Sequence, residues 1–566
     1  MATHLTVTAI EWERVHLTIR LQVTSYGTAA DDVPSVDRIF IRDVTQWHDV
    51  EWSGEGDDSY VVHINISTFR NRTFLPSGTW KFHAVLSSGE EIGATCDLDA
   101  VDALDDYTRV FLFSDNKKAY TVSFGITENE LAPLLAMRSY LFSRGGPAAK
   151  PSLLRHPIKR LWREAKGVTS GVRKRKVVRM IYDAELKAHQ IRRAMQRSGG
   201  NPPRPRILFA SEQRNGLEGN LLAVRDRMVE RGLQKDFDFR YSFRTPQTAE
   251  RKTLIAMLRK LAQADIVLLD DYFAPLDWLR LNPEAKYIQL WHAGSGFKSI
   301  GYSRFGKFGS PALRNAHRHY TYSITGSRHL KHVYAEAFGI EEEAVIPTGL
   351  PRIDAFLDPA RQAEATERVY RRFPNLKGKR VILFAPTFRG RGLKDASYDY
   401  GQIDFEELYD FCGEDTIVAF RMHHFIPGPV PIPDSMRDRL VDVSHYAEGN
   451  ELLLVSDILI TDYSSIIYEF SLLKRPMLFF AYDEQVYSAV RGFHRRYAET
   501  APGKICHTFG ELLTALRDGD HETWRGDKFR EENFDHIDAR SSDRVIDWLI
   551  LGEPPLEAIA PVTSQG

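Results

Sequence analysis

The chain lacks long apolar runs and contains little cysteine. No apolar stretch reaches the roughly 18 residues of a membrane-spanning helix, and the start, from Met1 to Leu5, does not have the basic and then apolar layout of a secretion signal. Cys96, Cys412 and Cys506 lie far apart without a CxxC pair, which argues against a zinc site and a disulfide framework. We therefore expect a cytoplasmic protein with buried, inert thiols.

The net charge is also small, at -1 over 566 residues, but one segment is rich in basic residues. In the segment Arg144–Arg206, 18 Lys and Arg residues stand against three acids, with apolar residues such as Leu161 and Trp162 among them. Such segments bind anionic membrane surfaces or nucleic acid, and a solvated linker of charged helices is the alternative. We expect a membrane surface and no nucleic acid, because no motif that reads RNA or DNA accompanies the segment.

Hydrophobic periodicity predicts two kinds of sheet. From Leu5 to about Phe124, apolar and polar residues alternate with period two, which predicts a small antiparallel β-sandwich. From Arg206 onward short apolar strands alternate with helices, and a second such series begins at Val381; this pattern predicts parallel sheets with crossover helices. The expected fold class is α/β, with two tandem Rossmann-like domains preceded by an N-terminal antiparallel β-sandwich and a basic helical linker.

The predicted domain division follows these patterns, since a chain of this length commonly holds about three domains. It comprises a β-sandwich accessory domain (1–125), a basic helical membrane-association or linker segment (126–203), a first Rossmann-like domain (204–365), a second Rossmann-like domain (366–550) and a tail (551–566). We expect a cleft between the two Rossmann-like domains.

The stretch from Ser456 to Glu469 is the most informative in the chain. It predicts a buried strand, a polar turn and a helix, which places Ser464, Ser465 and their backbone N–H groups at a helix N-terminus. Helix N-termini bind anions such as phosphate, although Thr, Asp and Ser are also ordinary capping residues. Because open α/β sheets bind ligands at the carboxyl ends of their strands, we favour a ligand site over a plain cap.

Further polar residues cluster where other strands are predicted to end. They are His292, Arg352, Asp354, Thr387, Arg389, Arg421 and His423. Arginine offers a fork of donors suited to phosphate oxygens, and histidine titrates near neutral pH. Each residue alone is compatible with a surface salt bridge or a structural hydrogen bond, but together they indicate a cationic phosphate pocket.

Six short motifs follow one another in a defined order. They are Trp291–Ala293, Thr348–Asp354, Ala385–Arg389, Arg421–His423, Asn450–Ser465 and Arg475–Met477. Their order and spacing resemble the CDP-glycerol glycerophosphotransferase family of teichoic acid synthesis, over roughly Arg206 to Leu549. This resemblance implies a GT-B-like fold, in which 204–365 is the acceptor side and 366–550 binds the nucleotide. It also implies a peripheral location on the inner face of the cell membrane.

Carried over motif by motif, the resemblance implies that His292 and His423 are catalytic, with His292 as the base. The implied substrate-binding residues are Gly349, Arg352, Asp354, Pro386, Thr387, Arg389, Arg421, Thr461, Asp462, Ser464 and Ser465, with Asp462 orienting its loop. No metal ligand is implied. The chain departs from many family members at Ala293-Gly294-Ser295-Gly296, where they have Gly-Thr-Pro, so the acceptor side stays open.

The implied reaction transfers glycerol phosphate, or a related polyol phosphate, from a CDP-polyol donor to a hydroxyl of a lipid-linked polymer acceptor of the teichoic acid type. The hydroxyl attacks the phosphorus next to the polyol, a histidine takes its proton, and CMP leaves in line. No cofactor is required, and Mg²⁺ is compatible because it commonly bridges phosphates. A CDP-ribitol donor, a nucleotide-sugar glycosyltransferase on the same fold and an inactive membrane-bound scaffold are the alternatives.

Overall fold

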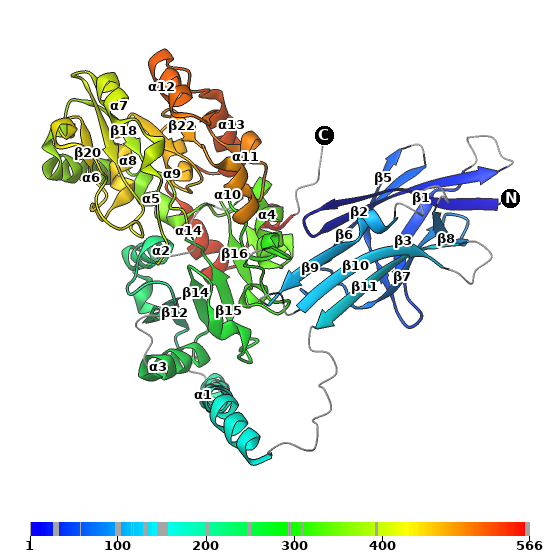
Figure 1. Cartoon of the computed structure of the whole chain (residues 1–566). Coiled ribbons are helices and arrows are strands. Elements are labelled where there is room, and N and C mark those ends of the chain that lie inside the picture. The colour runs from blue at the N-terminus through cyan, green and yellow to red at the C-terminus, as the bar shows by residue number, and fades with distance from the viewer. Residues whose placement is uncertain are drawn as a thin grey trace. The chain divides into compact units, whose positions relative to one another are not determined.

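The computed structural model in Figure 1 describes most of the chain. The described residues are 2–26, 33–56, 58–96, 104–114, 116, 118–127, 133–143, 157–199, 203–245, 251–292, 294, 296–307, 309–390 and 394–560. Part of the predicted membrane-binding segment, 144–156 and 200–202, lies outside them, as do the side chains of 157–176 and therefore the basic run 173–176.

The chain forms two compact units, each with its own internal contacts. Unit 1 comprises Met1–Ser170, Ile300–Arg318 and Glu336–Ile340, and unit 2 comprises Gly171–Ser299, His319–Ala335 and Glu341–Gly566. The predicted mixed α/β class is confirmed, because unit 1 is rich in strands and unit 2 alternates strands with helices. The five-part division at residues 125, 203, 365 and 550 stays a prediction.

Unit 1 contains strands β1 to β11, which pair antiparallel except for β1 with β8. Their bounds are β1 Ala2–Glu13, β2 His16–Tyr26, β3 Val36–Arg42, β4 Trp47–Asp49, β5 Glu51–Gly56, β6 Ser59–Asn65, β7 Gly78–Leu86, β8 Glu91–Cys96, β9 Arg109–Phe113, β10 Lys118–Ile126 and β11 Leu135–Ser143. The strand order is β5-β6-β2-β1-β8-β7-β11-β10-β9, and β3 pairs with β7 and β4. Period-two alternation produces this β structure: Leu17, Ile19 and Leu21 of β2 are all at most 1% exposed.

The β structure extends beyond the predicted limit at residue 125. Strand β11 pairs with β10 and β7, and its alternate residues Leu135, Met137 and Ser139 are buried while Tyr140 and Phe142 are exposed. The predicted helical segment 126–203 therefore begins with a strand. The buried row of that strand ends in a serine, so its alternation is less apolar than that of the earlier strands.

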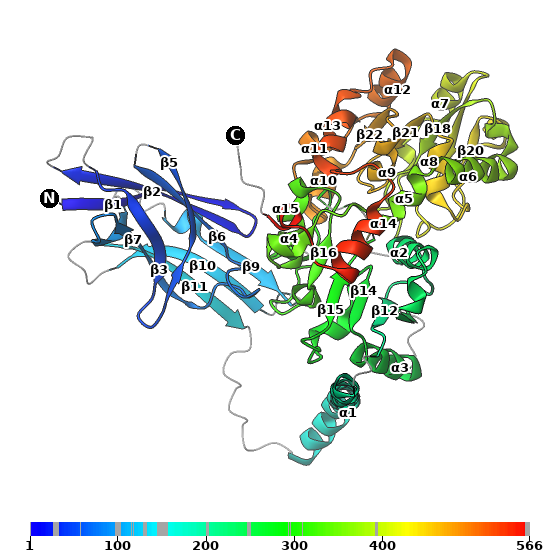
Figure 2. The ribbon, with the colours of Figure 1, turned by 180° about the vertical axis from the view of Figure 1, so that it is seen from behind.

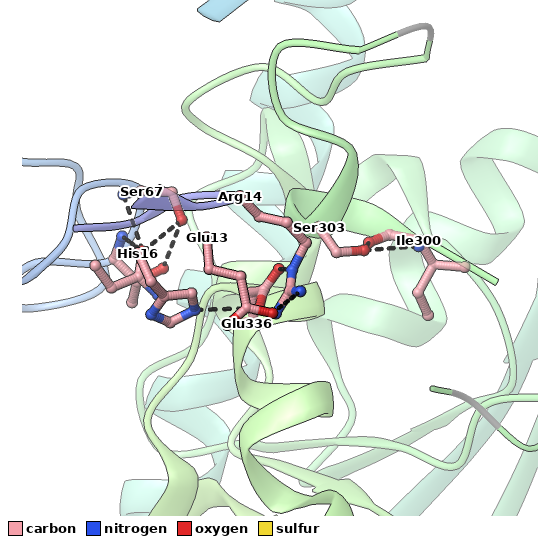
Figure 3. Close-up of polar contacts among 9 residues, drawn as sticks. Glu13, Arg14, His16, Ser67, Ile300, Ser303 and Glu336 are labelled. Carbon is pink, nitrogen blue, oxygen red and sulfur yellow. Dashed lines mark hydrogen bonds and ion pairs between the residues drawn. The ribbon is translucent and has the colours of Figure 1, made fainter. Parts of the chain in front are cut away.

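A buried carboxylate ties the β1–β2 turn to the helical part of unit 1 (Figure 3). Arg14 donates from Nε and Nη2 to the two carboxylate oxygens of Glu336, both at 2.8 Å, and His16 Nε2 lies 3.1 Å from Oε2. The Glu336 side chain is only 2% exposed. A buried carboxylate needs such partners, because desolvation of an unpaired charge costs several kcal/mol, roughly 3–5 kcal/mol when one partner is removed.

Helix α1 (Pro157–Ser198) is the predicted basic helical segment. Four of its residues are buried at helical spacing, namely Val178, Tyr182, Leu186 and His189. Part of the apolar content of the segment is thus used in packing within unit 2, where Arg193 pairs with Asp265. Among the described residues, no helix has both the length and the apolar character needed to cross a membrane.

Unit 2 contains two six-stranded sheets, and every strand pair in them is parallel (Figures 1 and 2). The first sheet consists of β12 Arg206–Ser211, β13 Asp238–Phe243, β14 Ile266–Leu269, β15 Lys286–Gln289, β16 Tyr322–Ile324 and β17 Val345–Ile346, in the order β13-β12-β14-β15-β16-β17. The second consists of β18 Arg380–Phe384, β19 Thr416–Phe420, β20 Leu440–Asp442, β21 Ile458–Thr461, β22 Met477–Phe480 and β23 Lys504–Cys506, in the order β20-β19-β18-β21-β22-β23. Strands of parallel sheets are buried on both faces, and β19 is indeed buried along its whole length.

Helices connect and cover these strands. Those of the first half, which contains the first sheet, are α2 Gly219–Glu230, α3 Arg251–Ala262, α4 Lys331–Phe338 and α5 Pro351–Leu357, with α4 divided between the units. Helix α6 Pro359–Arg372 follows α5 and packs against Gly449–Leu454 of the second half. Those of the second half are α7 Phe405–Cys412, α8 Gly449–Leu454, α9 Ile467–Leu472, α10 Glu484–Val490, α11 Tyr497–Thr500, α12 Phe509–Asp518 and α13 Trp524–Asn533.

The C-terminal segment returns to the first half of unit 2. It contains α14 (Ser541–Arg544), a π-helical stretch (Val545–Leu551) and α15 (Leu556–Ile559). Asp543 accepts hydrogen bonds from Arg227 of α2 at 2.8 and 2.9 Å and from Arg231, the residue after α2, at 3.1 Å. The second half of unit 2 is therefore fastened to the first by the end of the chain.

Candidate active site

The polar residues predicted from the sequence gather at the carboxyl ends of the two parallel sheets. The direction of strand succession reverses between β12 and β14 in the first sheet and between β18 and β21 in the second. Open α/β sheets bind ligands in the crevice outside such reversal points. His292 follows β15, the strand next to β14, while Thr387 and Asp462 follow the two strands that flank the second reversal.

His292 is held with one ring nitrogen facing two acceptors. Its Nδ1 lies 3.3 Å from the carbonyl oxygen of Asp270 and 3.3 Å from Oδ2 of Asp271. Since both neighbours only accept hydrogen bonds, Nδ1 carries the proton in the neutral ring and the lone pair is on Nε2. Burial lowers the pKa of His292, the Asp271 charge raises it, and Arg352 and Arg214 lower it. The side chain is 36% exposed, so a neutral acceptor nitrogen is available at neutral pH.

The turn that carries His292 is fixed by Asn220, at the start of α2. The Asn220 amide donates to the carbonyl oxygens of Leu290 and Trp291, both at 2.8 Å, and its Oδ1 accepts from the backbone N–H of Arg352 at 2.9 Å. Trp291 has φ of 53°, a left-handed conformation that costs about 1–3 kcal/mol for a residue other than glycine. Asn220 is 1% exposed. It therefore joins two predicted site motifs and stabilises the unusual backbone at Trp291.

Arg352 pairs with Glu469 of α9 through Nη2, a contact between the two halves of unit 2. Burial raises the pKa of Glu469, and the Arg352 charge opposes part of that rise. Gly349 and Asp354 of the same motif lie against α14 instead. Gly349 has φ of 83°, and a Cβ there would collide with Oγ of Ser541. Asp354 accepts from the backbone N–H groups of Ser541 and Ser542 at 2.9 and 2.6 Å.

Asp462 joins the loops that follow β18 and β21. Its Oδ1 accepts from the backbone N–H of Thr387 at 2.7 Å, and its Oδ2 accepts from Nη1 of Arg389 at 2.8 Å. Arg389 also donates from Nε and Nη2 to Asp483 at 2.6 and 2.8 Å and from Nη1 to the Thr387 carbonyl at 2.6 Å. Four of its five N–H donors are thus engaged inside the protein. Direct contact of Arg389 with a diphosphate stays a prediction, and the geometry makes it chiefly a brace for these loops.

The other predicted residues near Asp462 are Thr461, Pro386, Ser464 and Ser465. The first two are buried at or just after the strand ends, and the two serines lie in the turn before α9. Thr461 is buried and donates to the carbonyl of Ala385 at 2.7 Å, and Pro386, the second residue after β18, is also buried. The predicted strand, turn and helix are confirmed, but α9 begins at Ile467, so Ser464 and Ser465 lie in the turn that precedes it. Both are partly exposed, and Ser464 Oγ accepts from the Ile466 N–H at 3.4 Å. Phosphate binding by these two serines stays a prediction.

His423 is a second neutral imidazole, with the opposite proton position. Its Nδ1 accepts from the backbone N–H of Phe425 at 3.2 Å, so the neutral ring carries its proton on Nε2. Burial lowers the pKa of His423 to about 4, and the charges of His424, Lys298 and Arg421 act in the same direction. The His424 ring stacks on it with centroids 4.4 Å apart. Arg421 makes one weak bond, at 3.5 Å to the Met422 carbonyl.

Sequence patterns missed the residues that support this site. Asn220 lies in a helix of ordinary composition, Asp271 and Glu469 were not distinguished from other acids, and Asp483 lies outside the motifs. The position of Asp271 two residues after a buried strand was the one available signal. Among the described residues, no group of three or more His, Cys, Asp or Glu side chains is placed to hold a metal ion.

Comparisons with known proteins identify a family and several relatives. The family profile described as CDP-Glycerol:Poly(glycerophosphate) glycerophosphotransferase matches residues 197–551. The teichoic acid poly(ribitol-phosphate) polymerase of Bacillus spizizenii is 38% identical over 349 residues, which cover 61% of this chain and 56% of that protein. The ribitol-phosphate polymerase TarK of Staphylococcus aureus is 39% identical over 60% of this chain and 67% of its own length. The chain thus spans just over half of the Bacillus relative.

A solved structure is similar in fold. The wall teichoic acid polymerase TagF, as a single-residue variant soaked with CDPG, superposes with a TM-score of 0.51 at 23% identity over 64% of this chain and 96% of that one. A second single-residue variant of the same polymerase gives a TM-score of 0.51 over 69% of this chain and 97% of that one, also at 23% identity. At this identity the comparison establishes the fold alone.

Proposed function

Because the chain belongs to the CDP-glycerol:poly(glycerophosphate) glycerophosphotransferase family, we propose that it transfers a polyol phosphate from a CDP-polyol to a hydroxyl of a lipid-linked acceptor of the teichoic acid type. CMP is the second product. The observation that carries the proposal is the pair of neutral histidines with opposite proton positions. His292 offers an acceptor nitrogen, as a base requires, and His423 offers a donor, as a phosphate oxygen requires.

In the proposed reaction the acceptor hydroxyl attacks the phosphorus atom next to the polyol. The new O–P bond forms as the P–O bond to CMP breaks, and the hydroxyl proton moves to Nε2 of His292. Positioning and charge neutralisation dominate phosphoryl transfer. Arg421 makes one weak side-chain hydrogen bond, and the Glu448 carboxylate acts on it only through its charge. It is therefore the cation of the predicted pocket that is most available for the phosphates. The proposal needs no metal ligand from the protein, and Mg²⁺ carried by the diphosphate is compatible with it.

The choice of polyol comes from the relatives. The two relatives described above carry ribitol-phosphate names, so we propose ribitol phosphate as the first unit to test and glycerol phosphate as the second.

The sequence difference from other family members at 293–296 includes Gly294, which packs closely in the structure. A Cβ at Gly294 would collide with the ring of Tyr468. The loop after His292 therefore approaches α9 more closely than a larger residue at this position would allow.

We further propose that the chain is GT-B-like, with a β-sandwich accessory domain, and works at the cytoplasmic face of the membrane. The two parallel sheets of unit 2 support the first part. The basic composition of Arg144–Arg206 supports attachment to an anionic membrane surface. Replacement of the four basic residues at 173–176 by neutral ones is expected to reduce sedimentation with anionic vesicles at low salt, and unchanged sedimentation would favour a solvated linker.

The test is release of CMP by the purified full chain. CDP-ribitol and CDP-glycerol are each supplied with a short lipid-linked polyol-phosphate acceptor, and uridine and guanosine diphosphate sugars are supplied in parallel. Acceptor-dependent CMP release from either CDP-polyol, abolished in a folded His292→Ala variant, is the expected result. If neither CDP-polyol gives CMP and a nucleotide sugar is turned over, the protein is instead a glycosyltransferase.

A further inference from the structure

Lys298 is a half-buried cation that has no directly bonded counterion in the part of the chain that the structure describes. It lies seven residues after Trp291, and the structure gives its ammonium no hydrogen bond and no ion pair among the described residues. Its Nζ lies 5.8 Å from the ring centroid of Tyr487. Burial lowers the pKa of Lys298 to about 8. A desolvated cation without a partner destabilises a fold, so its retention calls for an occupant that is absent from the protein itself.

The backbone directs Lys298 from the first half of unit 2 toward the second. Its segment pairs with the loop after α10, through a bridge between Lys298 and Phe493 and bonds of 3.2 Å from Ser299 N to Gly492 O and 3.1 Å from His494 N to Phe297 O. These bonds fix the point at which the side chain leaves the backbone.

The charged groups around the ammonium come from four loops of the second half. Asp462 after β21 raises the pKa of Lys298, while Arg491 after α10 and Arg389 after β18 lower it. Lys298 in turn acts on His423 after β19. Asp462 is already occupied by Arg389 and the Thr387 N–H, so it balances only part of this local positive charge.

Two more groups near these loops have unused hydrogen-bonding capacity. Thr387 is 8% exposed, and its Oγ1 is buried without a hydrogen-bond partner among the described residues. Arg421 makes only the weak carbonyl contact at 3.5 Å, although its charge, like that of Lys298, acts on His423. An unsatisfied buried hydroxyl costs about 1–3 kcal/mol. One anion with several oxygens would satisfy the hydroxyl and neutralise both cations.

We propose that Lys298, Arg421 and Oγ1 of Thr387 form the binding site for the diphosphate of the nucleotide donor, with Lys298 as its principal cation. This inference rests on the proposed function for the identity of the donor. Lys298, which no sequence motif singled out, then binds the diphosphate. Arg389 acts as a positioning residue that holds the loops of Thr387 and Asp462. Lys298 follows His292 in the same loop. A diphosphate bound to Lys298 is therefore held at a fixed position relative to the His292 base.

The test is calorimetric binding of CDP, and of inorganic pyrophosphate, to the full chain. Lys298→Met keeps the length of the side chain and removes the charge, and is expected to weaken CDP binding by about 10- to 100-fold, the effect of losing one charge-assisted hydrogen bond. Lys528→Met is the matched control, because Lys528 is 59% exposed and forms only a surface ion pair at 3.7 Å with Glu532. CDP affinity of this control is expected to stay unchanged.

Two further readouts separate ligand binding from a structural role. Lys298→Met is expected to leave the melting temperature unchanged or higher, whereas Arg389→Gln, which breaks two carboxylate contacts, lowers it. CDP affinity of the native protein is expected to fall as pH rises through about 8, where the ammonium loses its proton. Lys298→Arg, which stays protonated, removes that fall while retaining binding.

The outcomes distinguish this inference from the proposed function. Equal CDP binding by the native protein and Lys298→Met would overturn the Lys298 assignment and leave polyol-phosphate transfer standing. Binding of pyrophosphate but not CDP, lost in Lys298→Met, would support the anion site and overturn the cytidine donor. Failure of the native protein to bind either compound would overturn both.

Discussion

Nδ1 of His292 lies 3.3 Å from Oδ2 of Asp271, the second residue after β14. This contact joins the ends of two neighbouring strands of the first sheet, β14 and β15. It gives the imidazole a defined tautomer and a partner for the positive charge that develops when Nε2 takes a proton. The pair is therefore the structural basis for assigning the base.

Asp271→Asn is expected to lower kcat by about 10²-fold or more, the usual contribution of a positioned general base. The pH profile gives a second readout. Activity requires neutral His292 and so falls as pH drops through its pKa; because the Asp271 charge raises that pKa, its loss moves the acid limb to lower pH. Rate measurements from pH 5 to 8 test this. A limb that stays in place would show that Asp271 does not act on the base.

Arg352→Met is expected to destabilise the protein by about 3–5 kcal/mol, because it leaves Glu469 buried and unpaired. The sign of the pH dependence follows from the raised pKa of Glu469. Below its unfolded pKa, near 4.3, the carboxyl is protonated in both states. As pH rises, the unfolded state loses this proton while the folded state retains it, so stability falls. Urea unfolding at pH 5 and pH 7 should show the larger loss at pH 7.

Arg352→Met with Glu469→Gln is the control for this prediction. The neutral amide removes the unpaired charge, so most of the lost stability should return and its pH dependence should disappear. Equal destabilisation in the single and double variants would mean that Arg352 stabilises the fold by packing rather than by charge.

Asn220→Ala is expected to lower kcat more than it raises the KM for the donor. It removes the two bonds that hold the carbonyls of Leu290 and Trp291, so the turn that carries His292 loses its support. Each buried group left unsatisfied costs about 1–3 kcal/mol. Asn282→Ala is the matched control, since Asn282 is also a buried asparagine of unit 2, 4% exposed. A similar fall in kcat in this control would reduce the Asn220 effect to general destabilisation.

Arg14→Met is expected to destabilise unit 1 by about 3–5 kcal/mol, because it removes both guanidinium hydrogen bonds to the buried Glu336 carboxylate shown in Figure 3. Thermal unfolding followed by near-ultraviolet circular dichroism measures the loss. Arg38→Met is the control, since Arg38 pairs with Asp49 through side chains that are 42% and 50% exposed and such pairs contribute about 0–1 kcal/mol. Equal losses in the two variants would contradict a special role for the buried carboxylate.

Local sequence pattern predicted which kinds of helix and strand form, but it predicted poorly where domains and elements begin and end. Period-two alternation predicted the antiparallel strands, and the strand, turn and helix around Asp462 form as expected. Strand β11 was missed because its buried row includes Ser139. The return of the C-terminal segment to the first half was also missed, since contacts such as Asp543 with Arg227 join residues 316 positions apart, and no local pattern encodes them.

The sequence by itself determined the parallel α/β character, the positions of the polar turns and, through its motifs, the family. These properties depend on the spacing of apolar residues and on the identity of residues close in the chain. Only the tertiary structure decided what each cation does. Arg389 and Arg421 occupy similar places after adjacent strands, yet Arg389 meets Asp462 and Asp483 while Arg421 makes only a weak carbonyl contact. Charge pairing depends on the distance between side chains in space. The partner Asp462 of Arg389 lies 73 residues farther along the chain and meets it only in the folded structure.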